Sequence, residues 1–145
     1  MPRPYASTVV NAPVDEVWAL LRNFNGLTEW HPAVVKSTIE DGKSAAEVGC
    51  IRDLALPDGG QIRERLLAFS DSERFYSYNF ETTPFDVKNY CGTLKVSPVT
   101  DGNRTFVEWW TTFDCEPAKI DEWVGTFAHE IFKPGLDSLK TKFGG

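Results

Sequence analysis

The sequence predicts an α+β fold in which a curved, seven-stranded antiparallel sheet wraps around a long C-terminal helix. Three observations lead to this prediction. Apolar residues alternate with a period of two through the middle of the chain, from residue 33 to residue 113. Short links without helical patterning join these segments, so neighbouring strands are expected to pair as antiparallel hairpins. The apolar period then changes to that of an amphipathic helix over residues 117–142.

The N-terminal segment predicts a strand followed by a helix. Residues 5–11 are short or β-branched and favour a strand. Pro13 indicates the first turn of a helix, because the N–H that proline lacks would have no partner there. Asn11 or Ala12 is the expected N-cap. A residue before proline disfavours the helical conformation, so a second helical turn is expected to end before His31-Pro32. Two short helices are therefore expected, one running to about residue 22 and one around residues 27–30.

Six further strands are expected after these helices. Clusters of Gly, Pro, Asp and Ser separate them, as at Asp41-Gly42 and Asp101-Gly102. Their consecutive order predicts one meandering sheet. The expected strands are residues 33–40, 47–56, 61–70, 74–82, 87–97 and 103–113.

The C-terminal residues 117–142 carry one apolar stripe that Pro134-Gly135 interrupts. Proline removes a backbone hydrogen bond and clashes with the preceding turn, so the helix is expected to kink near residue 134. A strongly bent sheet and a single helix do not interdigitate along their whole length. A central cavity is therefore expected between them, within a single ligand-binding domain that spans residues 1–145.

Composition and charge restrict the class of partner. The chain has 15 Lys and Arg against 21 Asp and Glu, a net charge of −6, and no basic run that suits nucleic acid or an anionic membrane. No stretch approaches the roughly 20 apolar residues of a membrane span, and the N-terminus lacks a signal-peptide core. A cytoplasmic protein without membrane insertion is expected. The three cysteines lack the spacing of a disulfide framework or a structural zinc site, and neither histidine has the companions of a metal site, so no metal is expected. No cofactor is expected either.

Three motifs spread over nearly the whole chain resemble a known superfamily. They are Val-Asn-Ala-Pro-Val-Asp-Glu-Val-Trp-Ala-Leu-Leu at residues 10–21, Trp30-His31-Pro32, and the Phe- and Leu-rich C-terminal helix. They are similar to the START-like, helix-grip superfamily, which includes the polyketide cyclase/dehydrase (SRPBCC) family and lipid-transport domains. The resemblance implies the helix-grip fold with a cavity. It leaves the activity open, because binders, carriers and enzymes share this scaffold.

Shorter stretches resemble particular members of the superfamily. Residues 49–52, 63–69 and 76–80 resemble lachrymatory-factor synthases, and Asn89-Tyr90-Cys91-Gly92-Thr93 is similar both to these enzymes and to plant abscisic-acid receptors. The turn at residues 56–60 loosely resembles the gate loop of those receptors, but a tight hairpin with two glycines is the favoured interpretation. The lysine that the receptors place inward on the preceding strand has no counterpart here. Hormone reception is therefore disfavoured.

Alternation places two charged residues on apolar strand faces. Arg52 shares its face with Leu54, and Glu64 shares its face with Ile62 on the next expected strand. An unpaired buried charge is very costly, so Arg52 and Glu64 are expected to meet in the cavity as an ion pair. The resemblance to lachrymatory-factor synthases implies that Glu64 shuttles a proton while Arg52 orients an oxyanion and tunes Glu64. A purely structural bridge and a polar anchor for a ligand carboxylate remain open alternatives.

Aromatic and apolar residues complete the expected binding site. Tyr78 and Tyr90 match two pocket tyrosines of the same enzymes, with ordinary core packing as the alternative. Alternation with Val107 favours Trp109, rather than Trp110, as the inward residue. The expected ligand-binding residues are Tyr78, Tyr90, Trp109, His31, Phe80, Leu54 and Phe127.

The sequence thus predicts a protein that binds a small apolar or aromatic molecule between the sheet and the C-terminal helix. Two functions remain open. The first is a cofactor-free isomerase, cyclase or lyase that uses Glu64 as its acid/base group. The second is a non-catalytic carrier or sensor of a small hydrophobic metabolite. Monomer and homodimer are both compatible with the sequence, and a protein-interaction module would require an exposed aromatic patch.

Overall fold

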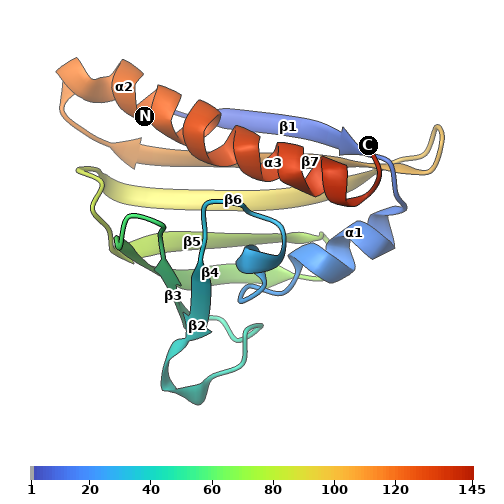
Figure 1. Ribbon diagram of the computed structural model, residues 1–145, viewed down its shortest axis with the longest axis horizontal. Helices are drawn as coiled ribbons and strands as arrows, with labels where there is room; N and C mark the ends of the chain where they lie inside the picture. Colours follow the sequence, from blue (N-terminus) through green and yellow to red (C-terminus); the bar gives the residue numbers. More distant parts are fainter. Residues whose placement is uncertain (1) are drawn as a thin grey trace.

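The computed structural model describes residues 2–145 and has the predicted α+β architecture (Figure 1). Seven strands form one antiparallel sheet in the order β1-β7-β6-β5-β4-β3-β2, so strands consecutive in sequence from β2 to β7 are neighbours and β1 closes against β7. The strands are β1 (Tyr5–Val10), β2 (Lys36–Ile39), β3 (Ile51–Ala55), β4 (Gln61–Ser70), β5 (Phe75–Thr82), β6 (Lys88–Val99) and β7 (Arg104–Asp114).

Two strands are shorter than the sequence pattern predicts. Strand β2 begins at Lys36 rather than residue 33, and β3 begins at Ile51 rather than residue 47. In both places a turn hydrogen bond lies beside a few remaining cross-strand bonds, such as the one from the Gly49 N–H to the Leu66 carbonyl at 2.8 Å. The Cys50 N–H donates to the Glu47 carbonyl at 3.0 Å, and the Ala33 N–H donates to the side chain of His31. Period-two alternation indicates the face of the sheet on which a side chain lies, but it does not show where such local turns occur.

Two short helices follow β1, as predicted: α1 (Val14–Leu21) and the 3-10 helix η1 (Leu27–Glu29). The N-cap of α1 is Pro13, so the expectation of Asn11 or Ala12 is wrong. The Ala12 N–H donates to the Val10 carbonyl at 2.9 Å, which turns the chain before the helix begins. The Pro13 carbonyl then accepts the Val17 N–H at 3.2 Å, and no side chain caps the helix.

The C-terminal helix changes its hydrogen-bond pattern along its length. Pro134 lies in the first turn of the last segment, directly after a π-helical stretch, and not in the middle of a regular α-helix. Proline has no N–H to donate, and the first turn of a segment is where that loss matters least. The segments are η3 (Pro117–Lys119), α2 (Ile120–Gly125), the π-helix η4 (Thr126–Phe132) and α3 (Lys133–Lys142).

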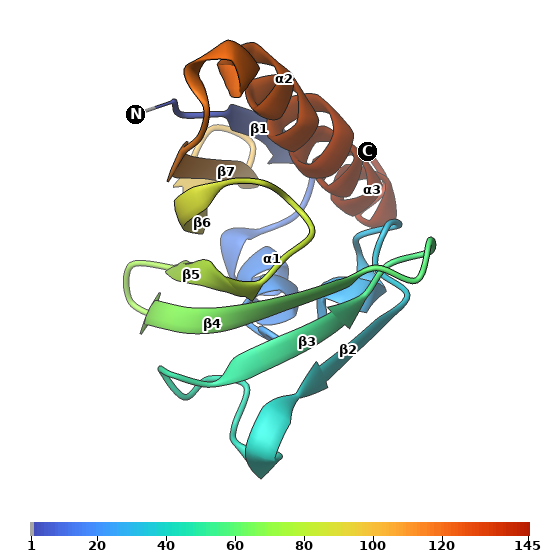
Figure 2. The same ribbon diagram turned by 90° about the vertical axis from the view of Figure 1, so that its left-hand side faces the viewer.

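The sheet curves around the space beside the C-terminal helix (Figure 2). The helix packs on β1 and β7, whereas β3 and β4 lie away from it on the other side of the curve. Register places Arg52 opposite Glu64 between β3 and β4, and Tyr78 opposite Gly92 between β5 and β6. The fold therefore directs side chains of several strands toward one interior space. Within residues 2–145, no helix has the length and apolarity needed to span a membrane.

Candidate functional site

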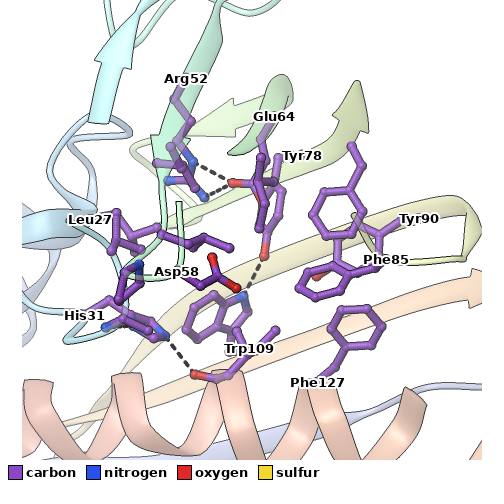
Figure 3. Close-up of a pocket in the computed structure, with 18 residues that line it drawn as sticks. Leu27, His31, Arg52, Asp58, Glu64, Tyr78, Phe85, Tyr90, Trp109 and Phe127 are labelled. Carbon is purple, nitrogen blue, oxygen red and sulfur yellow. Dashed lines mark hydrogen bonds and ion pairs between the residues drawn. The ribbon is translucent and has the colours of Figure 1, made fainter. Parts of the chain in front are cut away.

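A cavity of about 320 Å³ lies between the concave face of the sheet and the C-terminal helix (Figure 3). Its wall comes from strands β3 to β7, from the π-helical segment, from the chain around η1 and from the β3–β4 loop. All nine residues that the sequence singled out lie in this wall, while their roles in binding or catalysis stay predictions. These residues are His31, Arg52, Leu54, Glu64, Tyr78, Phe80, Tyr90, Trp109 and Phe127.

The charged residues of the cavity form the expected ion pair. The guanidinium of Arg52 donates from Nε to Glu64 Oε1 at 2.7 Å, and its Nη2 lies 2.7 Å from the same oxygen. Arg52 is 1% exposed and Glu64 is 5% exposed. Both charges have left water, so each depends on the other for its stability inside the protein.

Arg52 has a second partner, Phe24, that holds it in place. Its Nη1 donates to the backbone carbonyl of Phe24 at 2.9 Å, and its guanidinium lies over the Phe24 ring, 4.0 Å from the centroid. Burial disfavours the charged form of Arg52, but Glu64, Tyr76 and Tyr78 together outweigh this effect and keep its pKa raised. All three guanidinium nitrogens thus contact acceptors of the protein itself.

Glu64 has one engaged oxygen and one free oxygen. Both Arg52 contacts fall on Oε1, and no donor among residues 2–145 contacts Oε2. Every fully buried side-chain oxygen or nitrogen of these residues has a partner, so Oε2 is reachable from the cavity. Burial raises the pKa of Glu64 above its usual range, although Arg52 opposes this shift. A carboxylate of this kind is suited to accept and return a proton.

Tyr78 and Trp109 form a second polar contact in the wall. The indole Nε1 of Trp109 donates to the Tyr78 hydroxyl oxygen at 2.9 Å. The Tyr78 hydroxyl is therefore an acceptor in this bond, and its own proton remains available to another group. The opposite residue on β6, Gly92, makes room for the ring, because a Cβ there would lie 2.5 Å from Tyr78 Cζ. Burial raises the pKa of Tyr78 well above its usual range, so this hydroxyl is a donor and not a phenolate.

Stacked aromatic rings form the apolar side of the cavity. Tyr90 and Phe80 stack with centroids 3.8 Å apart, and Tyr90 lies 5.2 Å from Phe127 of the π-helical segment. Phe85, in the β5–β6 connection, adds a ring 5.5 Å from Phe127. Phe85 was not predicted from the sequence, because residues in connections carry no alternation that indicates the direction of their side chains. Such a wall favours apolar or aromatic ligands.

His31 is a buried, neutral residue that joins the chain after η1 to the C-terminal helix. Its Nε2 donates to the Ile131 carbonyl at 2.8 Å, and its Nδ1 accepts the Ala33 N–H at 3.1 Å. Burial lowers the pKa of His31, the bond to Ile131 opposes this, and Arg52 lowers it further. A Cβ at Gly135 would lie 2.6 Å from His31 Cδ2, so glycine allows the helix to approach this closely. Both ring nitrogens are occupied by backbone groups, which favours a structural role.

The β3–β4 loop also reaches the cavity. Leu56, Pro57 and Asp58 lie in its wall, although the sequence had favoured the interpretation of a tight hairpin. The hairpin features are present too, since Gly59 has a φ of 87° and Asp58 Oδ1 accepts the Gly60 N–H at 2.8 Å. The loose likeness to a gate loop was the signal that could have identified these residues. Among residues 2–145, no cluster of His, Cys, Asp and Glu is arranged to hold a metal ion.

The family model for polyketide cyclase/dehydrase and lipid transport proteins matches residues 1–144. The abscisic acid receptor PYL7 of Arabidopsis thaliana is 29% identical in an alignment of 135 residues. The alignment covers 90% of this chain and only 63% of that receptor's length.

Two bacterial proteins of solved structure share both sequence and fold with this chain. The protein XoxI from Bacillus cereus is 36% identical with a TM-score of 0.89, covering 99% of this chain and 96% of its own. A protein from Thermobifida fusca is 30% identical with a TM-score of 0.91, covering 99% of this chain and 94% of its own. From its sequence and its helix-grip architecture, this chain belongs to the polyketide cyclase/dehydrase and lipid transport family.

Proposed function

We propose that this protein binds a small, largely apolar molecule in the cavity and moves a proton within it through Glu64, without a cofactor. One observation carries the proposal. A buried carboxylate presents a free oxygen, Oε2, to a cavity with a mainly aromatic and aliphatic wall. The whole chain, residues 1–145, would act as one ligand-binding domain.

The proposed step is an isomerisation, cyclisation or elimination. Glu64 Oε2 accepts a proton from one position of the bound molecule and returns it to another position or to a leaving group, so no electron acceptor is needed. The contacts of Arg52 support a positioning role, because this residue holds Oε1 and the Phe24 carbonyl and acts on the bound molecule through Glu64. The free proton of Tyr78 suits an oxygen of the ligand that gains negative charge.

A carrier or sensor is the second candidate, and two observations favour it. The Arg52–Glu64 pair is complete without any ligand, as a structural bridge would be. The similar Arabidopsis protein is a hormone receptor by name, and the family description includes lipid transport.

Ligand-observed NMR of the purified protein separates the two candidates. Mixtures of apolar phenols, polyketide-like aromatics, isoprenoids, sulfur-containing metabolites and small apolar acids are recorded at once and again after a day. We expect one class to show broadened signals that are then replaced by those of a product. Broadened signals that persist unchanged would identify a carrier or sensor, and the absence of broadening for every class would contradict the proposed binding.

A further inference from the structure

The charged side chains of the cavity wall disfavour a negatively charged ligand. Among the described lining residues, the basic side chains are Arg52 and His31, and the acidic ones are Glu64 and Asp58. Which of these are free to meet a ligand decides the charge that the cavity accepts.

Neither basic side chain is free. The guanidinium of Arg52 contacts Glu64 Oε1 and the Phe24 carbonyl, and only 1% of its side chain is exposed. If a ligand carboxylate formed an ion pair with Arg52 in place of Glu64, Glu64 would stay buried without its counter-ion, which is strongly unfavourable. His31 is neutral, because Nδ1 accepts a backbone N–H while Nε2 donates to a backbone carbonyl.

Both acidic residues line the cavity, and each keeps one carboxylate oxygen that has no hydrogen-bond partner among residues 2–145. Glu64 Oε2 is reachable inside the cavity. Asp58 is exposed on the β3–β4 loop, and only its Oδ1 is used, by the Gly60 N–H. Figure 3 shows Asp58 beside the space bounded by Tyr78 and Trp109. Among the described lining residues, an anion that enters would therefore meet two carboxylates and no cation that lacks a protein partner.

We infer that the cavity selects an uncharged molecule that carries a hydroxyl, carbonyl or amide group and rejects the carboxylate, sulfonate or phosphate analogue. This inference rests on the proposed function and narrows its substrate class. The Tyr78 hydroxyl donates to the ligand oxygen, and Glu64 Oε2 accepts a ligand O–H or N–H. The interpretation of the ion pair as an anchor for a ligand carboxylate is thereby disfavoured.

The size of the cavity restricts the ligand as well. Its volume of about 320 Å³ lies at the lower end of the range of about 300–1,000 Å³ that is usual for small-molecule pockets. A small aromatic ring system fills such a space, and its wall contains the stacked rings of Tyr90 and Phe80 and the tilted ring of Phe127.

A competition experiment with isosteric probes tests the inference. N-phenyl-α-naphthylamine, an uncharged dye that fluoresces in apolar surroundings, serves as the reporter, and β-naphthamide and β-naphthoate compete for its site at neutral pH. The two competitors have nearly the same shape and differ in charge. We expect the amide to displace the dye at a concentration about tenfold lower than the carboxylate requires.

Two substitutions test whether the cavity causes this preference. Asp58→Asn is expected to increase the affinity for naphthoate about threefold relative to the affinity for naphthamide. Asp53→Asn is the matched control, because it removes the same charge from the same hairpin at a residue outside the cavity wall. Glu64→Gln removes the negative partner of Arg52. In this variant the affinity for naphthoate is expected to exceed the affinity for naphthamide.

The possible outcomes separate the two proposals. If the dye binds and naphthoate competes as well as naphthamide, the charge inference is wrong while the binding proposal survives. If the preference is present but responds equally to Asp58→Asn and Asp53→Asn, it reflects the net charge of −6 and the inference is also wrong. If the dye does not bind at all, the proposed binding function fails and the inference fails with it.

Discussion

Two guanidinium nitrogens of Arg52, Nε and Nη2, each lie 2.7 Å from Oε1 of Glu64, and the other oxygen, Oε2, faces the cavity. The two residues are directly opposite in the β3–β4 register, and their side chains are almost completely buried. One pair of residues therefore serves the stability of the sheet and the chemistry proposed for the cavity. Substitutions that separate these two contributions are the most informative.

Arg52→Ala is expected to destabilise the protein by about 3–5 kcal/mol, because it leaves the carboxylate of Glu64 buried without a partner. Urea unfolding measures the change. The double variant Arg52→Met with Glu64→Leu removes both charges and is expected to recover most of the loss. Arg63→Ala, which breaks a partly exposed pair with Glu40, is the control and is expected to have a much smaller effect. Equal losses for Arg52→Ala and Arg63→Ala would contradict the assignment.

Glu64→Gln tests the proton-transfer role, because glutamine keeps the shape of the side chain but its amide group is neither an acid nor a base near neutral pH. With the compound that the NMR screen identifies, turnover is expected to fall by at least about a hundredfold, within the range typical of general acid–base catalysis, while binding of that uncharged compound persists. Single-turnover kinetics and titration by NMR measure the two quantities. Turnover equal to that of the unchanged protein would show that Glu64 does not transfer the proton.

Gly92→Ala is expected to distort the cavity, since its Cβ would lie 2.5 Å from Cζ and 2.7 Å from the hydroxyl of Tyr78. Tyr78 must move and lose its bond from Trp109, at a cost of about 1–3 kcal/mol. Denaturant unfolding and dye affinity should both decrease. Gly125→Ala is the control, because nothing lies within 4 Å of its Cβ position in the helix. This variant is expected to increase the free energy of unfolding by about 0.4–1 kcal/mol. Dye affinity that is unchanged in Gly92→Ala would argue against this packing.

His31 is expected to make stability depend on pH. Its pKa is lowered in the folded protein, so the unfolded chain binds the proton first and stability falls as pH decreases below about 6.5. Glu64, whose pKa is raised, acts in the opposite direction, because its folded form binds the proton more readily. Comparison with a variant that lacks the histidine isolates the effect of His31.

The stability advantage of the unchanged protein over His31→Asn should therefore shrink between about pH 7 and about pH 5, at a rate of up to about 1.4 kcal/mol per pH unit. Chemical unfolding at several pH values measures this difference. Parallel curves for His31→Asn would show that His31 is not held neutral by burial.

Much of the fold followed from local patterns in the chain. Alternation in the central segment identified strands β2 to β7 and placed Arg52 and Glu64 on facing positions, because a short hairpin joins their strands. The same logic selected Trp109 over Trp110 as the inward residue, and Trp109 is 3% exposed. Patterns of this kind are reliable where one strand face meets the core and the other meets solvent.

Loop residues were not predictable in this way. Phe85 and Asp58 lie in the cavity wall, yet the connections that hold them have no periodicity to indicate direction. The π-helical segment was missed for a related reason. An apolar stripe in the sequence does not distinguish backbone hydrogen bonds between residues four apart, as in an α-helix, from bonds between residues five apart, as in a π-helix. Pro134 indicated only that the hydrogen-bond pattern of the helix changes near this residue.

The sequence by itself determined the order of the elements, the face of each strand and the presence of a charged pair among apolar neighbours, because these depend on residue spacing along the chain. The tertiary structure alone decided that the Phe24 carbonyl holds Arg52, that backbone groups occupy His31, and that Glu64 keeps one oxygen free. These contacts join segments far apart in sequence, and their geometry depends on how the curved sheet, the short helices and the C-terminal helix close around one space.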